Sequence, residues 1–171
     1  MKTLDFDYVK IHPKAVTPEK LKGNLGFDLS VIADVGKADP EYKSTWPVSN
    51  TYPFKKNKNG CYEFYLAPGE RRIFHTGLKI AIQPGYGVIF YDRSGLGVIH
   101  GLTKHGGCID CTYRGEWLVC LYNTSHVYYS IKEKDRIIQC IAIQEYIINF
   151  HENKSLDDTF RGEKGFGSSG R

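Results

Sequence analysis

The stretch RRIFHTGLKIAIQPGYGVIFY, residues 71–91, decides the fold class. It holds three short apolar runs, and the turn-forming sequence QPGYG at 83–87 separates the last two. Short apolar runs bounded by Gly and Pro turns are typical of β-strands. Runs of the same kind recur at 26–35, 61–66, 107–111, 116–123, 127–131 and 136–148. The sequence therefore predicts an all-β domain, built as a sandwich or a barrel.

Two segments interrupt the strand pattern. SGLGVIHGL, residues 94–102, is the best candidate for a helix, but its three glycines limit it to a short one. Residues 36–60 are polar and rich in lysine and asparagine, and we interpret them as an insertion. The aromatic side chains of this insertion either contact a protein partner or pack on the domain itself; they are Tyr42, Trp46, Tyr52 and Phe54.

Length, charge and hydropathy narrow the class of protein. The chain of 171 residues suits one domain. Its net charge of +4 is mild and its cations are dispersed, so charge does not indicate binding to duplex nucleic acid. No run of 18 apolar residues occurs, and two aspartates stand in the first ten residues, so we expect neither a membrane span nor a signal peptide. The expected location is cytoplasmic, or the host cytoplasm for a viral source.

The five cysteines lack the spacing of a disulfide framework. Their number is odd, which suits reduced thiols in a cytosol. Cys108 and Cys111 form a C-x-x-C sequence, a spacing that occurs in zinc sites and in redox sites. A zinc site needs a second pair or nearby histidines, so we favour a structural role and assign no metal to this pair.

Two internal segments carry groups suited to chemistry. Arg93 and Ser94 follow an apolar strand, where a guanidinium and a hydroxyl can hold a phosphate; the alternative is an ordinary surface arginine beside a turn. Asp110 has apolar neighbours in a strand-to-turn stretch, which suits a general base. The alternative for Asp110 is an Asx-turn aspartate that stabilises its own turn.

The final segment, RGEKGFGSSGR at 161–171, has too few apolar residues to order itself, and we expect it to be mobile without a ligand. GFGSSG matches G-x-G-x-x-G, but no helix follows, so a dinucleotide-binding turn is excluded. Arg161, Ser168 and Ser169 suit phosphates, and the ring of Phe166 suits stacking on a base. A disordered terminus without function is the alternative.

Five segments, in order along the chain, resemble the five motifs of the trimeric dUTPase family. They are LGFDL (25–29), RSGLG (93–97), GCIDCTYRG (107–115), KDRIIQ (134–139) and RGEKGFGSSG (161–170). The resemblance implies a distorted β-barrel or jelly roll over residues 1–160, with one short helix, the insertion 36–60, and a mobile glycine-rich arm over 161–171. It also implies hydrolysis of dUTP to dUMP and pyrophosphate.

The same resemblance assigns roles at the reacting end of the substrate. Asp110 would act as the base for the water that attacks the α-phosphorus in line with the leaving pyrophosphate. Tyr113 would lie against the deoxyribose and exclude a 2'-hydroxyl by collision. Main-chain groups around Gly107 and Ile109 would pair with uracil.

The remaining implied roles concern phosphates, metal and assembly. Arg93, Ser94, Gly95 and Gln139 would contact phosphates, and Asp28 would hold a water bound to Mg²⁺. The arm would close over the site of a neighbouring subunit in a homotrimer with shared sites. The arm residues expected to contact dUTP are Arg161, Phe166, Gly167, Ser168 and Ser169.

The chain departs from the family pattern at three positions. The family usually has alanine, proline and glycine where this chain has Leu25, Asp92 and Lys134. Asp92 matters most, because a carboxylate beside Arg93 would oppose phosphate binding unless it points away.

Two other functions remain open from the sequence. A dCTP deaminase would share the fold and needs a glutamate as proton shuttle; Glu116 is the acid near enough to raise the question. A regulatory protein would keep the nucleotide pocket and act on a protein partner through residues 36–60.

Overall fold

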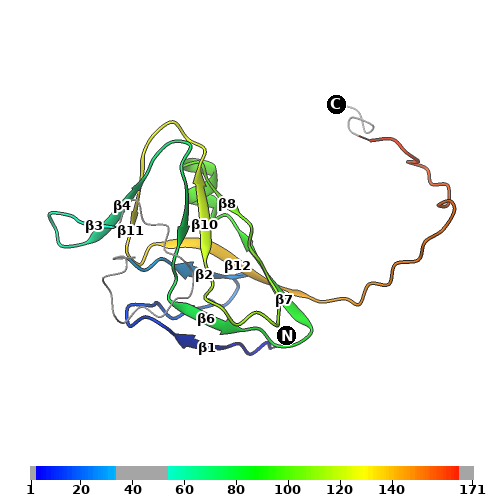
Figure 1. The fold of residues 1–171 in the computed structure, drawn as a ribbon, viewed down its shortest axis with the longest axis horizontal. Helices are drawn as coiled ribbons and strands as arrows, with labels where there is room; N and C mark the ends of the chain where they lie inside the picture. Colours follow the sequence, from blue (N-terminus) through cyan, green and yellow to red (C-terminus); the bar gives the residue numbers. More distant parts are fainter. Residues whose placement is uncertain (1–2, 34–53, 166–171) are drawn as a thin grey trace.

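The structure is a computed structural model that describes residues 3–33 and 54–165. Nearly all of its regular structure is strand, and the elements follow one another along the chain (Figure 1). They are β1 (Asp7–Lys10), β2 (Phe27–Ser30), β3 (Lys55–Lys56), β4 (Tyr62–Leu66), β5 (Arg71–Phe74), β6 (Leu78–Ala81), β7 (Tyr86–Tyr91), η2 (Gly95–Ile99), β8 (Leu102–His105), β9 (Cys108–Ile109), β10 (Val119–Asn123), β11 (Tyr129–Lys132) and β12 (Arg136–Gln144). The all-β prediction is confirmed.

The strands form four antiparallel sheets around one core. The orders are β1-β6, β5-β10-β8, β11-β4-β3 and β2-β12-β7-β9. The four-stranded sheet matters most for function, because β2, β7, β9 and β12 carry or precede residues of the predicted site. Within this sheet β12 is central and pairs along its length with β7 and near its start with β2.

The core is built by alternation along the strands. Val88 and Phe90 of β7 are buried, as are Val119 and Leu121 of β10, while their neighbours in sequence are more exposed. Trp117 is fully buried and lies 5.9 Å, between ring centroids, from Phe90. This period of two is the signal that the sequence carried.

The only helix among the described residues is η2, a five-residue π-helical turn. It lies inside the predicted range 94–102, and its brevity agrees with the expected effect of its glycines. None of the helical structure in 3–33 and 54–165 is long and apolar enough to cross a membrane.

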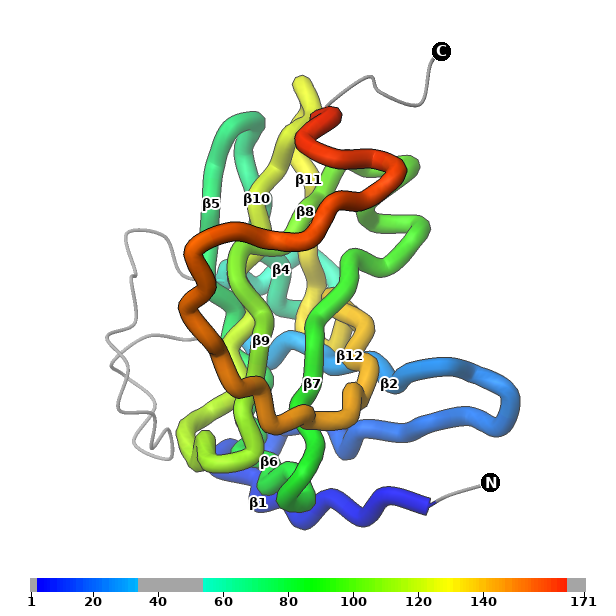
Figure 2. The backbone as a smooth tube through the Cα atoms, turned by 90° about the vertical axis from the view of Figure 1, so that its right-hand side faces the viewer, coloured from blue at the N-terminus to red at the C-terminus, as the bar shows by residue number. Residues whose placement is uncertain are grey.

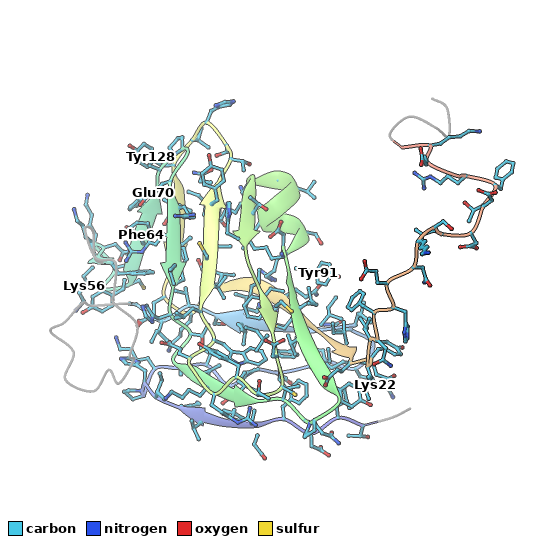
Figure 3. All side chains as sticks on the ribbon, turned by 45° about the vertical axis from the view of Figure 1, so that its right-hand side comes forward. Lys22, Lys56, Phe64, Glu70, Tyr91 and Tyr128 are labelled. Atoms are coloured by element: carbon cyan, nitrogen blue, oxygen red, sulfur yellow. The ribbon has the colours of Figure 1, made fainter. Side chains whose placement is uncertain are left out.

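The last strand ends earlier than predicted. Apolar residues continue to position 148, but β12 ends at Gln144, which pairs with Tyr86, the first residue of β7. Beyond that point no partner strand continues among the described residues, and a strand needs a partner for its backbone groups. Residues 145–165 leave the body as an extended arm whose side chains stand in solvent (Figures 1 and 3).

Sequence reasoning missed three strands. β1 and β3 are short and exposed, and β8 follows the glycine-rich turn directly. β8 exists because its residues pair with β10 over four positions, a contact that no local pattern encodes.

The end of the predicted insertion is part of the folded body. β3 pairs with β4, and the Phe54 ring is buried 5.8 Å from Phe64 and 6.3 Å from Phe74, centroid to centroid. Of the two alternatives for the aromatic side chains of the insertion, Phe54 therefore follows the second and packs on the domain itself. Tyr42, Trp46 and Tyr52 lie outside the described residues.

Candidate active site

A carboxylate and two guanidinium groups meet at one end of the four-stranded sheet. Oδ2 of Asp28 on β2 lies 3.2 Å from Nε of Arg93 and 3.3 Å from Nη1 of Arg136. Arg93 also donates from Nη1 to the carbonyl of Arg136 at 2.9 Å. The side chains of Asp28 and Arg93 are 18% and 28% exposed, so the pair is only partly screened by water.

Strand register explains why these segments meet. On central β12, Gln139 lies opposite Asp28 of β2 on one side and opposite Tyr91 of β7 on the other. Directly opposed residues point to the same face of a sheet, so the three side chains form a row. Tyr91 is half exposed, which identifies this face as the outer one (Figure 3). Arg93 lies two positions after Tyr91, just beyond the end of β7.

A cationic cleft of about 290 Å³ adjoins this row. Arg93, Lys134 and Arg136 line it against a single acid, Asp135. The other lining residues are Leu96, Tyr129, Ile131 and Ile137. Burial raises the pKa of the Tyr129 phenol, Asp135 raises it further, and Arg93 opposes both. Asp28 pairs with two of these cations, so three cations stand against two carboxylates, an excess of positive charge that suits an anionic ligand.

Asp92 points away from this cleft. Its Oδ1 accepts the backbone N–H of Lys104 at 2.8 Å, and its Oδ2 accepts the hydroxyl of Thr103 at 3.0 Å. Both partners lie on β8, so the carboxylate is held against that strand while Arg93 faces Asp28. The Asp92 carboxylate therefore points away from Arg93, which is the orientation in which it would not oppose phosphate binding there.

Ser94 and Gly95 stand at the start of η2. Ser94 is exposed and makes no capping hydrogen bond within the helix, and a Cβ added to Gly95 would meet open space. The hydroxyl of Ser94 is thus exposed to solvent and available to a ligand.

The second half of the predicted site is the β9 segment, residues 106–116. Gly106 and Gly107 both have positive φ, and a Cβ on Gly107 would lie 2.6 Å from Cβ of Phe90, so glycine is required there. The Gly107 carbonyl accepts the N–H of Phe90 at 2.7 Å. β9 is an edge strand of its sheet within the described residues, so one side of Cys108 and Ile109 can offer main-chain groups to a ligand.

Asp110 follows β9 and is exposed. Its carbonyl accepts the N–H of Tyr113 at 3.1 Å and closes a turn. Its carboxylate has no hydrogen-bond partner within 3–33 and 54–165, so the alternative of an Asx-turn aspartate has no support here. The hydroxyl of Tyr113 donates to the carbonyl of Glu116 at 3.0 Å.

The two halves of the site lie apart in one chain. The pairing of Val88 with Ile109, continued by one residue, places Asp110 opposite Gly87. Figure 2 shows β9 and β12 on opposite sides of β7. Gln139 lies opposite Tyr91, on the other side of β7. The backbone positions of Asp110 and Gln139 are therefore separated by roughly 13 Å along β7 and by about 10 Å perpendicular to it. One chain brings Asp28, Arg93 and Gln139 together but does not bring Asp110 to them.

The arm residues divide between described and undescribed positions. Arg161 is exposed on the arm, where its Nε donates to the carbonyl of Lys164 at 3.0 Å. The other four predicted arm contacts lie outside the described residues: Phe166, Gly167, Ser168 and Ser169.

Sequence reasoning missed Arg136, Lys134 and Tyr129 at this site. Arg136 stands inside the quoted segment KDRIIQ, three positions before Gln139, and its positive charge was the available signal. Tyr129 carried no signal, because only the fold brings β11 to the cleft.

Glu116, the residue that raised the question of deaminase chemistry, is 2% exposed. Its carboxylate is held by His75 and by the N–H of Gly77, away from the surface. It therefore cannot reach a substrate as a proton shuttle.

The comparisons with known proteins agree on one family. A sequence model described as dUTPase matches residues 59–170. A deoxyuridine 5'-triphosphate nucleotidohydrolase of Wolinella succinogenes is 32% identical over 174 aligned positions, which cover 100% of this chain and 97% of that protein. The protein of the same description from Wolbachia pipientis subsp. Culex pipiens is 46% identical over 110 positions, or 62% of this chain and 72% of that one.

Solved structures show the same fold. A Staphylococcus bacteriophage 80alpha dUTPase variant with dUpNHpp superimposes with a TM-score of 0.75 at 19% identity, covering 98% of this chain and 99% of that one. A dUTPase variant from phage phi11 of S. aureus, described with a structural Mg(II) ion, superimposes with a TM-score of 0.68 at 15% identity. The superposition covers 90% of this chain and 99% of that one.

Proposed function

The chain belongs to the dUTPase family, and from that premise we propose that it hydrolyses dUTP to dUMP and pyrophosphate. One observation in the fold carries the proposal. Three sequence segments, containing Asp28, Arg93 and Gln139, converge at one end of a single sheet beside a cationic cleft. Such convergence of dispersed polar groups on a charged cleft is expected of a phosphate-binding site.

The β9 segment supplies the base-recognition half of the proposed site. Its free edge offers alternating N–H and C=O groups, which can pair with the uracil edge and reject the different donor pattern of cytosine. The tight packing of Gly107 on Phe90 holds the backbone of this segment against β7. Tyr113 then covers the sugar, where a 2'-hydroxyl would collide with its ring.

Asp110 is the proposed general base. It is exposed and its carboxylate has no hydrogen-bond partner among the described residues, so it can accept a hydrogen bond from water. That water attacks the α-phosphorus as the proton passes to the carboxylate and the P–O bond to pyrophosphate breaks in line.

Magnesium fits this site as an ion held chiefly by the substrate. Among the described residues no three His, Cys, Asp or Glu side chains gather as ligands, and Asp28 is the acid nearest to Arg93. Mg²⁺ keeps several waters and commonly uses one carboxylate with substrate phosphates, so Asp28 would hold one of its waters. The bound ion would neutralise charge on the triphosphate.

We further propose that the active unit is a homotrimer whose sites are shared. The separation of Asp110 from Gln139 supports this, because both residues are expected beside the α-phosphate and a subunit interface would bring them together. The apolar arm supports it too, since Ile147 and Phe150 are each 91% exposed in one chain. In the trimer the arm would bring Arg161, Phe166, Gly167, Ser168 and Ser169 to a neighbour's site.

Substrate choice is tested by pyrophosphate release from dUTP, UTP, dCTP and dTTP. Hydrolysis confined to dUTP supports the proposal, and equal hydrolysis of all four contradicts the pocket. Ammonia release from dCTP would instead identify a deaminase.

Shared sites are tested by complementation. Asp110→Asn and Arg93→Ala are each expected to abolish most activity. Mixed and reassembled in equal amounts, they would restore about a quarter of the sites, because some sites draw both intact residues from different subunits. No recovery after verified subunit exchange would mean that both residues act from one chain.

A further inference from the structure

A buried carboxylate lies at the end of the β9 segment, residues 106–116, which carries Tyr113. Glu116 is 2% exposed; its Oε1 accepts the N–H of Gly77 at 2.8 Å, and its Oε2 lies 3.0 Å from Nδ1 of His75, which is 3% exposed. A carboxylate is costly to bury unless it is paired and hydrogen-bonded, and this one is both. It ties the end of the β9 segment to the connection between β5 and β6.

The backbone next to Glu116 is held to the same connection. Thr76 donates from its hydroxyl to the carbonyl of Trp117 at 2.7 Å, and Trp117 donates from its N–H to the carbonyl of Leu78 at 2.9 Å. Lys79 forms an isolated β-bridge with Glu116. Residues 116 and 117 are therefore held from both the side chain and the main chain.

This fixed backbone sets the position of the Tyr113 ring. The Tyr113 hydroxyl donates to the Glu116 carbonyl at 3.0 Å. The same ring covers Gly115 so closely that an added Cβ there would overlap the phenol. The Tyr113 ring is therefore held by a hydrogen bond at its hydroxyl and by close contact with Gly115. Both interactions depend on the backbone positions of residues 115 and 116.

We propose that Glu116, paired with His75, is a positioning residue that sets how strongly the enzyme prefers dUTP to UTP. The inference rests on the proposed function, in which Tyr113 lies against the deoxyribose. Glu116 touches no substrate; it fixes the carbonyl that holds the Tyr113 ring where a 2'-hydroxyl would collide with it. A displaced ring leaves room for that hydroxyl.

The test measures kcat and KM of the full chain for dUTP and for UTP. Glu116→Gln keeps the size of the side chain and removes its charge, and Tyr113→Phe removes the hydroxyl and keeps the ring. Each is expected to lower the ratio of kcat/KM for dUTP to that for UTP about tenfold, with UTP gaining through a lower KM. The double variant should show about the same ratio as the single variants, because both act through one hydrogen bond.

A matched control separates positioning from stability. Asn123 is also fully buried and hydrogen-bonded, but its amide donates to the carbonyls of Leu66 and Val127 and not to any residue of 110–117. Asn123→Ser should lower Tm and leave the dUTP:UTP ratio unchanged. A Glu116→Gln variant with lowered Tm and a wild-type ratio would overturn the inference, as would additive effects in the double variant.

His75 provides a second route if Glu116→Gln fails to fold. His75→Leu removes the nitrogen that faces Glu116 and should lower the ratio, whereas His75→Asn offers an amide N–H and should restore part of it. Equal ratios in both and in the wild type would contradict the inference. Failure of the proposed function is visible separately, since the wild type itself would then show no preference for dUTP.

Discussion

Nε of Arg93 lies 3.2 Å from Oδ2 of Asp28, although the two residues stand 65 positions apart in the chain. The contact joins the turn after β7 to β2 through the central strand β12. It orients Arg93 at the wall of the cationic cleft, with Arg136 as a second cation on the same carboxylate oxygen.

Asp28→Asn should loosen this arrangement. A neutral amide accepts hydrogen bonds from guanidinium groups more weakly than a carboxylate, by about 1 kcal/mol or more. We expect kcat/KM for dUTP to fall about tenfold and the MgCl₂ concentration needed for half-maximal rate to rise. Asp7→Asn, on exposed β1, is the control. An unchanged MgCl₂ titration would contradict the role of Asp28 beside the metal.

Asp110→Asn should depress turnover and spare binding. A general base contributes about 10² to 10⁴-fold to rate, while the amide retains the size of the side chain. The expected result is a fall in kcat within that range and a Kd for a non-hydrolysable dUTP analogue within about twofold of wild type. A variant with normal kcat would remove Asp110 from the chemistry.

Asp92→Ala should affect stability more than activity. The change leaves the Lys104 N–H and the Thr103 hydroxyl without their acceptor, at a cost of about 1 to 2 kcal/mol in the free energy of unfolding. Urea denaturation measures this cost, and KM for dUTP should change less than twofold. A large decrease in KM would instead mean that the Asp92 charge opposes the triphosphate.

Lys134→Gly should stabilise the protein. Lys134 has φ of 70°, the one positive value outside glycine among the described residues. Left-handed backbone costs a side-chain-bearing residue about 1 to 2 kcal/mol, and the added freedom of glycine in the unfolded chain returns part of that, so a net gain of about 0.5 to 1 kcal/mol is expected. Lys132→Gly, in strand β11, should destabilise by a similar amount. Destabilisation by Lys134→Gly would contradict the backbone argument.

Cys140 should resist alkylation in the folded protein. Burial raises the pKa of its thiol far above the usual range, and Asp28 adds to the rise, so the thiolate is scarce at neutral pH. Burial also raises the pKa of Cys120, which Arg71 partly offsets. Iodoacetamide at pH 8, followed by mass spectrometry, should label exposed Cys61 and Cys108 first and Cys140 only after unfolding. Early labelling of Cys140 would show that β12 opens readily.

The strand class, the short helix and the order of the motifs could all be predicted from the amino-acid sequence. Alternation in β7 and β10 and the turn residues between runs depend on neighbouring positions, so they can be read locally. Gly107 is different, because the need for glycine there comes from the Phe90 side chain on β7 and not from neighbouring positions.

Strand pairing and the contacts between distant side chains are visible only in the three-dimensional structure. Strand β8 and the end of β12 depend on partners elsewhere in the chain, and so do the contact of Arg136 with Asp28 and the direction of Asp92. The separation of Asp110 from Gln139 follows from the sheet order β2-β12-β7-β9, which no local pattern contains. The physical reason is that register and strand order are set by long-range pairing free energies, whereas periodicity records only which face of each strand is buried.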